Sequence, residues 1–197
     1  MAEGQRKVEV MTERNSNLGL WIARLRSADP AVGLEEALDA IDRDALDNAV
    51  GFAAEHARRY VASGGLLDGW DGPRPILILY TTGRRSGRIR RNPLLFFEAD
   101  GNRYLIGSKG GDDRHPEWYL NLTREPRVHV RVMDEVYQAD ARTVDWATRE
   151  RLWPALVARY PMFADYQQAT GREIPVVELL RPTPGEAGNE GDAGQAV

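Results

Sequence analysis

A run of arginines between two apolar segments is the feature that most constrains this chain. Residues 76–80, ILILY, form an apolar, partly β-branched run that is typical of a buried strand. A Thr-Thr-Gly segment interrupts it, and five arginines follow within eight residues, at positions 84, 85, 88, 90 and 91. An Asn-Pro pair then leads into a second apolar run. The pattern predicts a β-hairpin with a cationic end, where guanidinium groups and turn N–H groups can bind an anion.

The composition limits what the rest of the chain can be. With 197 residues and 42% hydrophobic content, the chain can bury one substantial core, so one domain is expected. The formal net charge is -4 and the isoelectric point about 5.5. The arginine cluster is therefore a local feature of an acidic protein, and extended binding to nucleic acid is not expected. The 24 arginines against two lysines fit a GC-rich bacterial genome, as in actinobacteria.

Missing residue types and motifs argue against several kinds of site. The absence of cysteine excludes disulfides and thiolate catalysis, and the three histidines lack the spacing of metal ligands, so no metal is expected. No Walker motif is present, and no G-x-G-x-x-G follows a strand, which disfavours nucleoside triphosphates and a Rossmann fold. The chain contains neither a signal peptide nor an apolar run of about 18 residues, so a cytoplasmic protein is expected.

Residues 1–70 are expected to form a helical N-terminal extension. Apolar residues at 18, 21, 22 and 25 have helical spacing. They predict a short docking helix or, as a rarer alternative, an interfacial helix in peripheral contact with the inner face of the cell membrane. A long amphipathic helix is expected from Leu34 to Tyr60, with His56 in its apolar stripe and an end at Ser63-Gly64-Gly65.

Residues 71–182 are predicted to form a barrel domain, and residues 183–197 a disordered tail. Further strands are expected at 103–108, 127–133, 136–144 and 173–180. Alternation in the second of these places valines inward and His129 toward solvent. Helices are expected at 116–122, with Asp112 or Asp113 as a possible cap, at 145–160, interrupted or restarted at Pro154, and at 161–170. About six strands joined mostly by hairpins favour an antiparallel α+β fold with a small closed β-barrel.

Three segments can supply chemistry if the fold brings them together. They are the arginine turn (residues 83–91), the turn Ser108-Lys109-Gly110-Gly111 and the helix start at Pro116. Each alone is a weak signal, since an arginine cluster is usually a solvated surface. Together they offer cations and free N–H groups, which suit a phosphate or polycarboxylate group. Trp118 and Tyr119 can cover an aromatic ring or belong to the core.

The motifs TTGRRSGRIRRNP, SKGGDDRHPEWYLNL and LWPALVARYP, with the later DYQ and IPVV, strongly resemble the deazaflavin-dependent nitroreductase family. These reductases use coenzyme F420 and include the F420H2-dependent quinone reductases. The resemblance runs from about Pro75 to Leu180 and implies a split β-barrel that binds the deazaflavin with its phosphate and glutamate tail. The cofactor-binding residues that it implies are Arg84, Arg85, Ser86, Arg90, Arg91, Asn92, Ile106, Gly107, Ser108, Lys109, Glu117, Trp118, Tyr119, Leu120 and Asn121.

The resemblance also implies where the hydride acceptor lies. Two tyrosines of the C-terminal helical part, Tyr160 and Tyr166, match family tyrosines near the acceptor, whereas a third such position is Phe163 here. Ser108, Tyr160 and Tyr166 are the predicted catalytic residues, which would orient the acceptor oxygen and stabilise its developing negative charge. The acceptor would be a quinone, a nitro compound or an activated alkene.

Three other functions stay open at this point, of which a nucleic-acid-binding module is the least favoured. The barrel can instead hold FMN, with its phosphate at the cationic end of the hairpin, which we call the cationic mouth, although F420 fits the motifs better. The protein can also be a carrier that binds F420 without turnover. The expected partner is a small molecule, with no nucleic acid, and the chain is expected to be a monomer or a homodimer.

Overall fold

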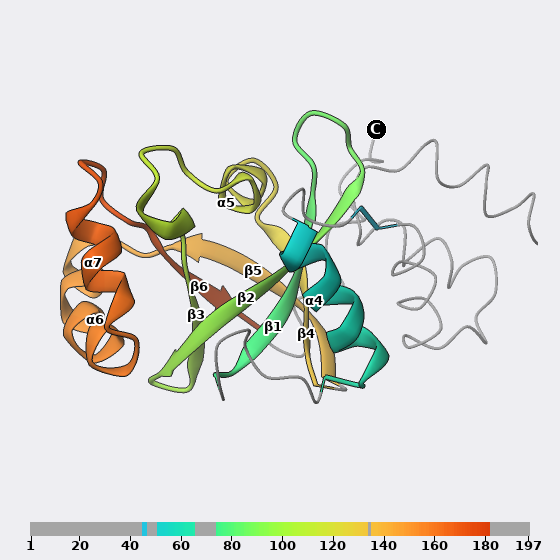
Figure 1. Cartoon of the computed structure of the whole chain (residues 1–197), viewed down its shortest axis with the longest axis horizontal. Helices are drawn as coiled ribbons and strands as arrows, with labels where there is room; N and C mark the ends of the chain where they lie inside the picture. Colours follow the sequence, from blue (N-terminus) through green and yellow to red (C-terminus); the bar gives the residue numbers. More distant parts are fainter. Residues whose placement is uncertain (1–44, 47–50, 66–73, 134, 182–197) are drawn as a thin grey trace, which may run out of the picture.

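Six antiparallel strands close into a barrel in the computed structural model, which describes residues 45–46, 51–65, 74–133 and 135–181. Around the barrel the strands follow the order β1-β2-β3-β6-β5-β4, and β1 pairs with both β2 and β4. Figure 1 shows this arrangement. The predicted antiparallel α+β fold with a closed barrel is confirmed. The strands are β1 (Ile76–Thr82), β2 (Ile89–Ala99), β3 (Asn102–Ile106), β4 (Arg127–Val132), β5 (Glu135–Thr143) and β6 (Val176–Leu180).

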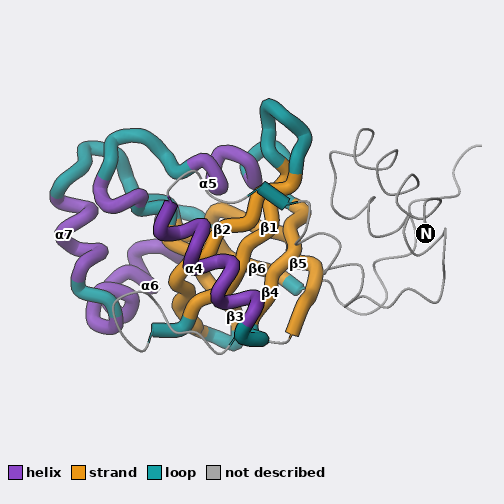
Figure 2. The backbone as a smooth tube through the Cα atoms, turned by 45° about the vertical axis from the view of Figure 1, so that its right-hand side comes forward, coloured by secondary structure: helices purple, strands orange, loops and turns teal. Residues whose placement is uncertain are grey.

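Helices surround the barrel on several sides (Figures 1 and 2). They are α4 (Gly51–Ala62), α5 (Glu117–Leu122), α6 (Trp146–Arg159) and α7 (Met162–Gln168), with a short 3-10 turn η1 (Lys109–Gly111). α4 lies across the outer face of β1, where Ala57 and Tyr60 join the same cluster as Ile78. α5 sits at one end of the barrel, and α6 and α7 pack beside β3.

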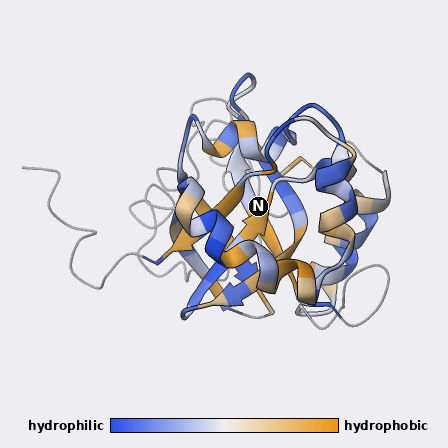
Figure 3. Ribbon diagram, turned by 90° about the vertical axis from the view of Figure 1, so that its left-hand side faces the viewer, coloured by the Kyte–Doolittle hydropathy of each residue, from blue (hydrophilic) through white to orange (hydrophobic). Residues whose placement is uncertain are grey.

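Strand alternation separates the interior of the barrel from its outer layers. Leu79 and Val130 lie opposite each other on β1 and β4 and belong to the interior cluster, together with Leu105 and Val177 from the other side. Each such buried side chain stabilises the fold by roughly 1.5–3 kcal/mol through the hydrophobic effect. Figure 3 shows the hydrophobic residues concentrated along the strands and the inward helix faces. The interior is thus a packed core, and polar groups are left to the ends of the barrel.

Two local predictions were wrong. α6 continues through Pro154 without a break. Both Pro154 and Glu150 are exposed, so the carbonyl that loses its helical donor is open to water. Neither aspartate caps α5: Asp112 accepts a hydrogen bond from the Arg114 backbone N–H (2.7 Å) and Asp113 from the Thr170 hydroxyl (2.8 Å). Both carboxylates are engaged before the helix begins.

The prediction that His129 faces solvent was also wrong. His129 lies opposite Tyr80 on the outer face of the barrel, yet only 4% of it is exposed. Tyr80 belongs to the cluster that packs against α4, so an outward position here is not a solvent position. The Nδ1 atom of His129 is buried without a hydrogen-bond partner, and burial lowers the pKa of this histidine to about 4.

Several predictions fall outside the described residues: the helix at 18–26, residues 34–44 and 47–50 of the long helix, the linker at 66–73 and the tail at 183–197. The prediction of one continuous helix from Leu34 to Tyr60 was wrong, because residues 45–46 are not helical and Leu46 forms an isolated parallel β-bridge with Arg90. α4 covers the last part of the predicted range, and His56 is buried on it, as predicted. Within the described ranges, none of the helices has the length and apolar character needed to cross a bilayer.

The buried His129 predicts a pH dependence of stability. Its folded pKa lies below the unfolded value of 6.5, so between 6.5 and about 4 the unfolded chain binds a proton that the native protein does not. Stability should be full above this window and fall by up to about 3 kcal/mol as the pH drops through it. Urea unfolding from neutral pH to about pH 4 should show a flatter dependence for His129→Gln than for the wild type. If the free energy of unfolding depends on pH equally in His129→Gln and in the wild type, His129 is not the group responsible.

The junction between α4 and the β4–β5 turn provides a second stability prediction. Gly65 has φ +82°, and a Cβ there would lie 2.1 Å from the Cα of Met133. Gly65→Ala should therefore lower the free energy of unfolding by roughly 2 kcal/mol or more, because left-handed strain and a backbone clash add. The matched control is Gly64→Ala, with φ +65° and open space, which should cost about 1 kcal/mol. Equal losses in urea denaturation would refute the clash.

Candidate functional site

The arginine turn and α5 meet at one end of the barrel. The Arg84 guanidinium donates to the Glu117 carboxylate, and the Arg84 backbone N–H donates to the Asn121 side-chain oxygen at 3.1 Å. The hydrogen bond from Arg84 lowers the pKa of Glu117, and the charges of Arg84, Arg85 and Lys109 lower it further. Cations of the arginine turn and of the Ser108 turn therefore both lower the pKa of a carboxylate on α5.

Asn121 connects this site to the barrel. It is buried on α5, and its Nδ2 donates to the Thr81 hydroxyl at 3.2 Å while its oxygen accepts from Arg84. Gly83 closes the turn by donating to the Arg88 carbonyl (2.8 Å), and a Cβ at Gly83 would lie 2.9 Å from the Ser86 Oγ. The tip of the hairpin is thus held from both sides, and this fixes the start of the arginine turn.

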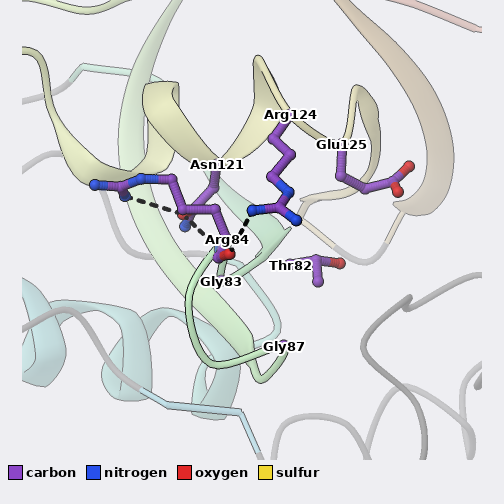
Figure 4. Close-up of a pocket in the computed structure, with 7 residues that line it drawn as sticks. All are labelled: Thr82, Gly83, Arg84, Gly87, Asn121, Arg124 and Glu125. Carbon is purple, nitrogen blue, oxygen red and sulfur yellow. Dashed lines mark hydrogen bonds between the residues drawn. The ribbon is translucent and has the colours of Figure 1, made fainter.

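A cavity of about 390 Å³ opens between the arginine turn and the end of α5, lined by Thr82, Gly83, Arg84, Gly87, Asn121, Arg124 and Glu125. Figure 4 shows Arg124 reaching across to the Arg84 carbonyl, to which it donates at 3.1 Å. The sequence predicted Arg84 and Asn121 for the site but missed Arg124. The spacing Asn121 to Arg124, about one helical turn, was the available signal.

The Ser108 turn is built to hold its backbone and present two polar side chains. Ile106 packs against the α6–α7 layer, and Gly107 donates to the Pro175 carbonyl at 2.9 Å, so both have structural roles. Ser108 is largely buried, and its hydroxyl hydrogen-bonds to no other side chain or backbone group in the described part of the chain. The Lys109 ammonium is partly exposed and lies 3.4 Å from Asp112. A hydroxyl and a cation are therefore available on one turn.

The predicted α5 residues differ in what they can offer. Trp118 is 6% exposed and belongs to the interior cluster, so its ring is a core residue. The Tyr119 ring lies 4.9 Å from the His115 ring, and its hydroxyl accepts from Thr143 at 3.2 Å. Leu120 is half-buried. Within the described part of the chain, Glu117 and Asn121 are the residues of this helix that form hydrogen bonds with the arginine turn.

The three predicted residues of β2 do not share one face. Arg91 is buried and lies opposite Tyr80, on the outer face of the barrel. Asn92 lies opposite Leu79, on the inner face, and Arg90 lies opposite Thr81 next to the mouth. Because successive side chains of a strand point to opposite faces, Arg90 and Arg91 cannot line the same side of the mouth.

The two candidate tyrosines of the acceptor region have different surroundings. Tyr160 is 2% exposed and donates its hydroxyl to the Phe96 carbonyl at 3.0 Å, and burial raises its pKa. Tyr166 is half-buried, and among the described residues its hydroxyl has no hydrogen-bond partner. Phe163 is a core residue between them, with ring centroids 6.1 Å from Tyr160 and 5.9 Å from Tyr166. A Cβ on Gly111 would lie 3.3 Å from the Tyr166 Cα, so α7 packs directly on the Ser108 turn.

In the described ranges, no group of three or more histidine, aspartate or glutamate side chains is arranged to hold a metal ion. The predicted residues place cations around one carboxylate, Glu117. Two of their hydroxyl groups, on Ser108 and Tyr166, have no hydrogen-bond partner among the residues that the structure describes. Such a site can bind an anion next to a polar acceptor.

Comparison with known proteins gives matches over this same region. A family model described as F420H(2)-dependent quinone reductase matches residues 52–181. The chain is 38% identical over 117 residues to the F420H(2)-dependent quinone reductase Rv1261c of Mycobacterium tuberculosis, a match that covers 56% of the chain and 76% of that protein. It is 34% identical over 114 residues to the putative F420H(2)-dependent quinone reductase Rv3178 of the same organism, covering 58% and 95%.

Two solved structures are also similar. One is an F420-H2 dependent reductase, FDR-A, which is 41% identical and matches over 54% of this chain and 94% of its own, with a TM-score of 0.49. The other is described as a domain-swapped dimer and is 36% identical over 67% of this chain and 99% of its own, with a TM-score of 0.51. With a family model that spans the barrel, α4 and the site, this chain belongs to the F420H(2)-dependent quinone reductase family and is an oxidoreductase, as its motifs predicted.

Proposed function

We propose that this protein transfers a hydride from reduced F420 to a quinone, with the cofactor held at the cationic mouth between the arginine turn, the Ser108 turn and α5. One observation carries the assignment of the site: the Arg84 guanidinium pairs with the carboxylate of Glu117, and the charges of Arg85 and of Lys109, on a separate turn, also lower the pKa of that carboxylate. Cations gathered from distant parts of a chain around one position form a binding site for negative charge.

The residues present fit the anionic part of the cofactor. Glu117 already places a carboxylate against the Arg84 guanidinium, so it stands in for an anionic group of a ligand. Arg84 is only 18% exposed, whereas Glu117 is 69% exposed, and the carboxylate can therefore turn into solvent while Arg84 stays in place. A phosphate or glutamate group would then accept from Arg84, from Lys109 and from the exposed tip at Arg85 and Ser86.

The remaining binding residues are proposed with the roles that their positions support. Arg90 and Asn92 lie on the inward-facing positions of β2 next to the mouth, and Arg91 supports the outer face of the same strand. Ile106 and Gly107 fix the Ser108 turn, and Asn121 fixes the arginine turn. Trp118, Tyr119 and Leu120 shape the wall of the mouth from α5. Most of the set thus holds backbone in position rather than contacting the ligand with a side chain.

The bound cofactor supplies the hydride from its ring, and the chain supplies binding, orientation and hydrogen bonds. The Ser108 hydroxyl and the Tyr166 hydroxyl are the donors available to an acceptor oxygen. A donor aimed at the oxygen that gains negative charge stabilises the transition state more than the bound substrate. Tyr160, the third predicted catalytic residue, already donates to the Phe96 carbonyl, so we assign it to the wall of the acceptor pocket.

Two alternatives are separated by one experiment. Titration of the purified protein with oxidised F420 and with FMN, side by side, distinguishes a deazaflavin site from a flavin site. A carrier would bind F420 tightly but would not oxidise reduced F420 in the presence of menadione or a nitroimidazole. Binding of F420 with menadione-dependent oxidation of its reduced form supports the proposal, and either other outcome refutes it.

The anchoring role of the arginine turn predicts a loss of cofactor affinity. Replacing Arg84 and Arg85 with alanine removes charge-assisted hydrogen bonds that contribute roughly 1.5–3 kcal/mol each, so the Kd for F420 should rise at least about tenfold. Fluorescence titration measures the effect. Stability should change little, because Arg85 is exposed and Arg84 pairs with a solvent-exposed carboxylate.

The matched control removes the same charge from the opposite end of the barrel. Arg151 pairs with Asp100 in the β2–β3 turn and Arg181 pairs with Glu135 at the start of β5, so Arg151→Ala with Arg181→Ala changes the net charge equally. This control should leave the Kd for F420 unchanged. Equal weakening in both double variants would show a general charge effect and remove the anchoring role.

The acceptor side predicts a different kinetic signature. Tyr166→Phe removes a hydroxyl that is free for the acceptor, so kcat with menadione should fall roughly 10- to 100-fold at unchanged F420 affinity. Tyr160→Phe removes only the hydrogen bond to the Phe96 carbonyl, so it should cost about 1 kcal/mol of stability and much less turnover. Turnover that falls with Tyr160→Phe but not with Tyr166→Phe would reverse this assignment.

A further inference from the structure

The Ser108 turn has an unusual backbone for a segment that carries a lysine. Lys109, Gly110 and Gly111 have φ values of 51°, 65° and 84°, so three consecutive residues lie in the left-handed region. Glycine adopts this conformation freely, whereas a residue with a Cβ such as Lys109 is disfavoured there. Inside the turn, the Gly111 N–H donates to the Ser108 carbonyl at 3.1 Å and the Asp112 N–H to the Lys109 carbonyl at 3.3 Å. These two local hydrogen bonds alone give little support to a segment in this conformation.

One side chain from a distant part of the sequence holds both ends of this turn. The Arg172 Nε donates to the Asp112 carbonyl at 2.9 Å, and its Nη2 donates to the carbonyls of Gly107 at 3.0 Å and Ser108 at 2.7 Å. These carbonyls precede and follow the left-handed residues. Because a guanidinium group is planar and its donors are fixed relative to one another, it sets the separation of the two ends of the turn.

Arg172 is itself held in place on its other side. Its backbone carbonyl accepts from the Gln167 side chain at 2.8 Å, and its backbone N–H donates to the Thr170 hydroxyl at 3.3 Å. That hydroxyl donates in turn to Asp113 at 2.8 Å, and the Arg172 Nη1 lies 3.3 Å from the His115 Nδ1. Of these four contacts, the first two fix the Arg172 backbone, and the last two connect the segment after α7 to Asp113 and His115. Because the Arg172 backbone is held in place, its guanidinium group can hold the turn in one position.

α7 closes the turn from the opposite side. A Cβ added to Gly111 would lie 3.0 Å from the Ala169 Cβ and 3.1 Å from the Tyr166 carbonyl oxygen. The turn is thus enclosed between the Arg172 guanidinium and the helix that carries Tyr166. A displacement of the turn would change the distance between the Ser108 hydroxyl and Tyr166, the two groups assigned to the acceptor.

We propose that Arg172 is a positioning residue of this enzyme, which holds the Ser108 turn in its left-handed conformation and so presents the Ser108 hydroxyl and the Lys109 ammonium to their ligands. This inference rests on the proposed function for its effect on catalysis. Its structural part, the control of the turn by Arg172, stands on the hydrogen bonds alone. The sequence gives no sign of this role, because Arg172 follows Gly171 at the end of a helical segment, more than 60 residues from the turn.

The test compares Arg172→Met with the wild type. Methionine keeps an unbranched, largely apolar side chain and removes every donor. Hydrogen exchange of the unliganded protein should become about tenfold faster in peptides that cover residues 107–113, while the strands keep their protection. In titration and steady-state assays, the Kd for F420 should rise by about tenfold and kcat with menadione should fall by at least as much. Arg172→Lys, which keeps one cation and fewer donors, should give intermediate values.

Arg151→Met is the matched control, since it removes an exposed arginine at the opposite end of the barrel and should change none of these values. A purely structural role would lower the amount of active protein and kcat without changing the Kd, so a raised Kd in folded protein separates positioning from folding. If residues 107–113 exchange hydrogen at the wild-type rate in both Arg172 variants, the inference is overturned. If Arg172→Met does not fold, Arg172→Lys decides the question alone by the same readouts.

The experiment also separates this inference from the proposed function. Failure of the wild type to bind F420 refutes the proposed function, and hydrogen exchange at 107–113 then still tests the control of the turn by Arg172. If the wild type binds F420 but the Arg172 variants keep the wild-type hydrogen exchange, Kd and kcat, only the positioning role is refuted.

Discussion

The antiparallel pairing of β1 with β4 closes the sheet into a barrel, and the position of every functional segment follows from that closure. β1 pairs with β2 on one side and with β4 on the other, so no strand edge is left beside the hairpin. The interior is filled by apolar side chains from all six strands and by Trp118 and Leu122 of α5. Because α5 must insert these residues into the end of the barrel, Glu117 and Asn121 are placed against the arginine turn.

The site shows how a protein with net negative charge maintains a local cationic surface. Arg84 is kept in position by Glu117 and by Asn121, which is buried and also bonded to Thr81. An exposed carboxylate compensates the guanidinium at little cost, since a solvent-exposed ion pair is weak and easily exchanged. The mouth is therefore preorganised for an anion without a large electrostatic strain in the free protein.

The Ser108 turn, on the proposed acceptor side, depends on contacts between segments that are far apart in the sequence. Arg172 binds the carbonyls on both sides of the Ser108 turn, and α7 packs on Gly111 from the other side. Arg149 extends this arrangement, because its guanidinium donates to the Ile174 carbonyl and to Gln167, which in turn holds the backbone of Arg172. A connected set of hydrogen bonds thus fixes the α6–α7 layer relative to the turn.

The sequence by itself determined the strands, the hairpin and the cationic turn, since these depend on local alternation, turn residues and charge. Its motifs also identified the family, and they named most of the residues that we propose for the mouth. Only the tertiary structure decided which of them are free to act. Alternation placed His129 outward, but its neighbour Tyr80 on that outer face packs in a cluster with α4, and nothing local in the sequence encodes which face is covered. Trp118 belongs to the core, the Tyr160 hydroxyl donates to the Phe96 carbonyl, and Arg172 donates to carbonyls of a distant turn, because packing and hydrogen-bond partners are set by contacts between segments that the barrel brings together.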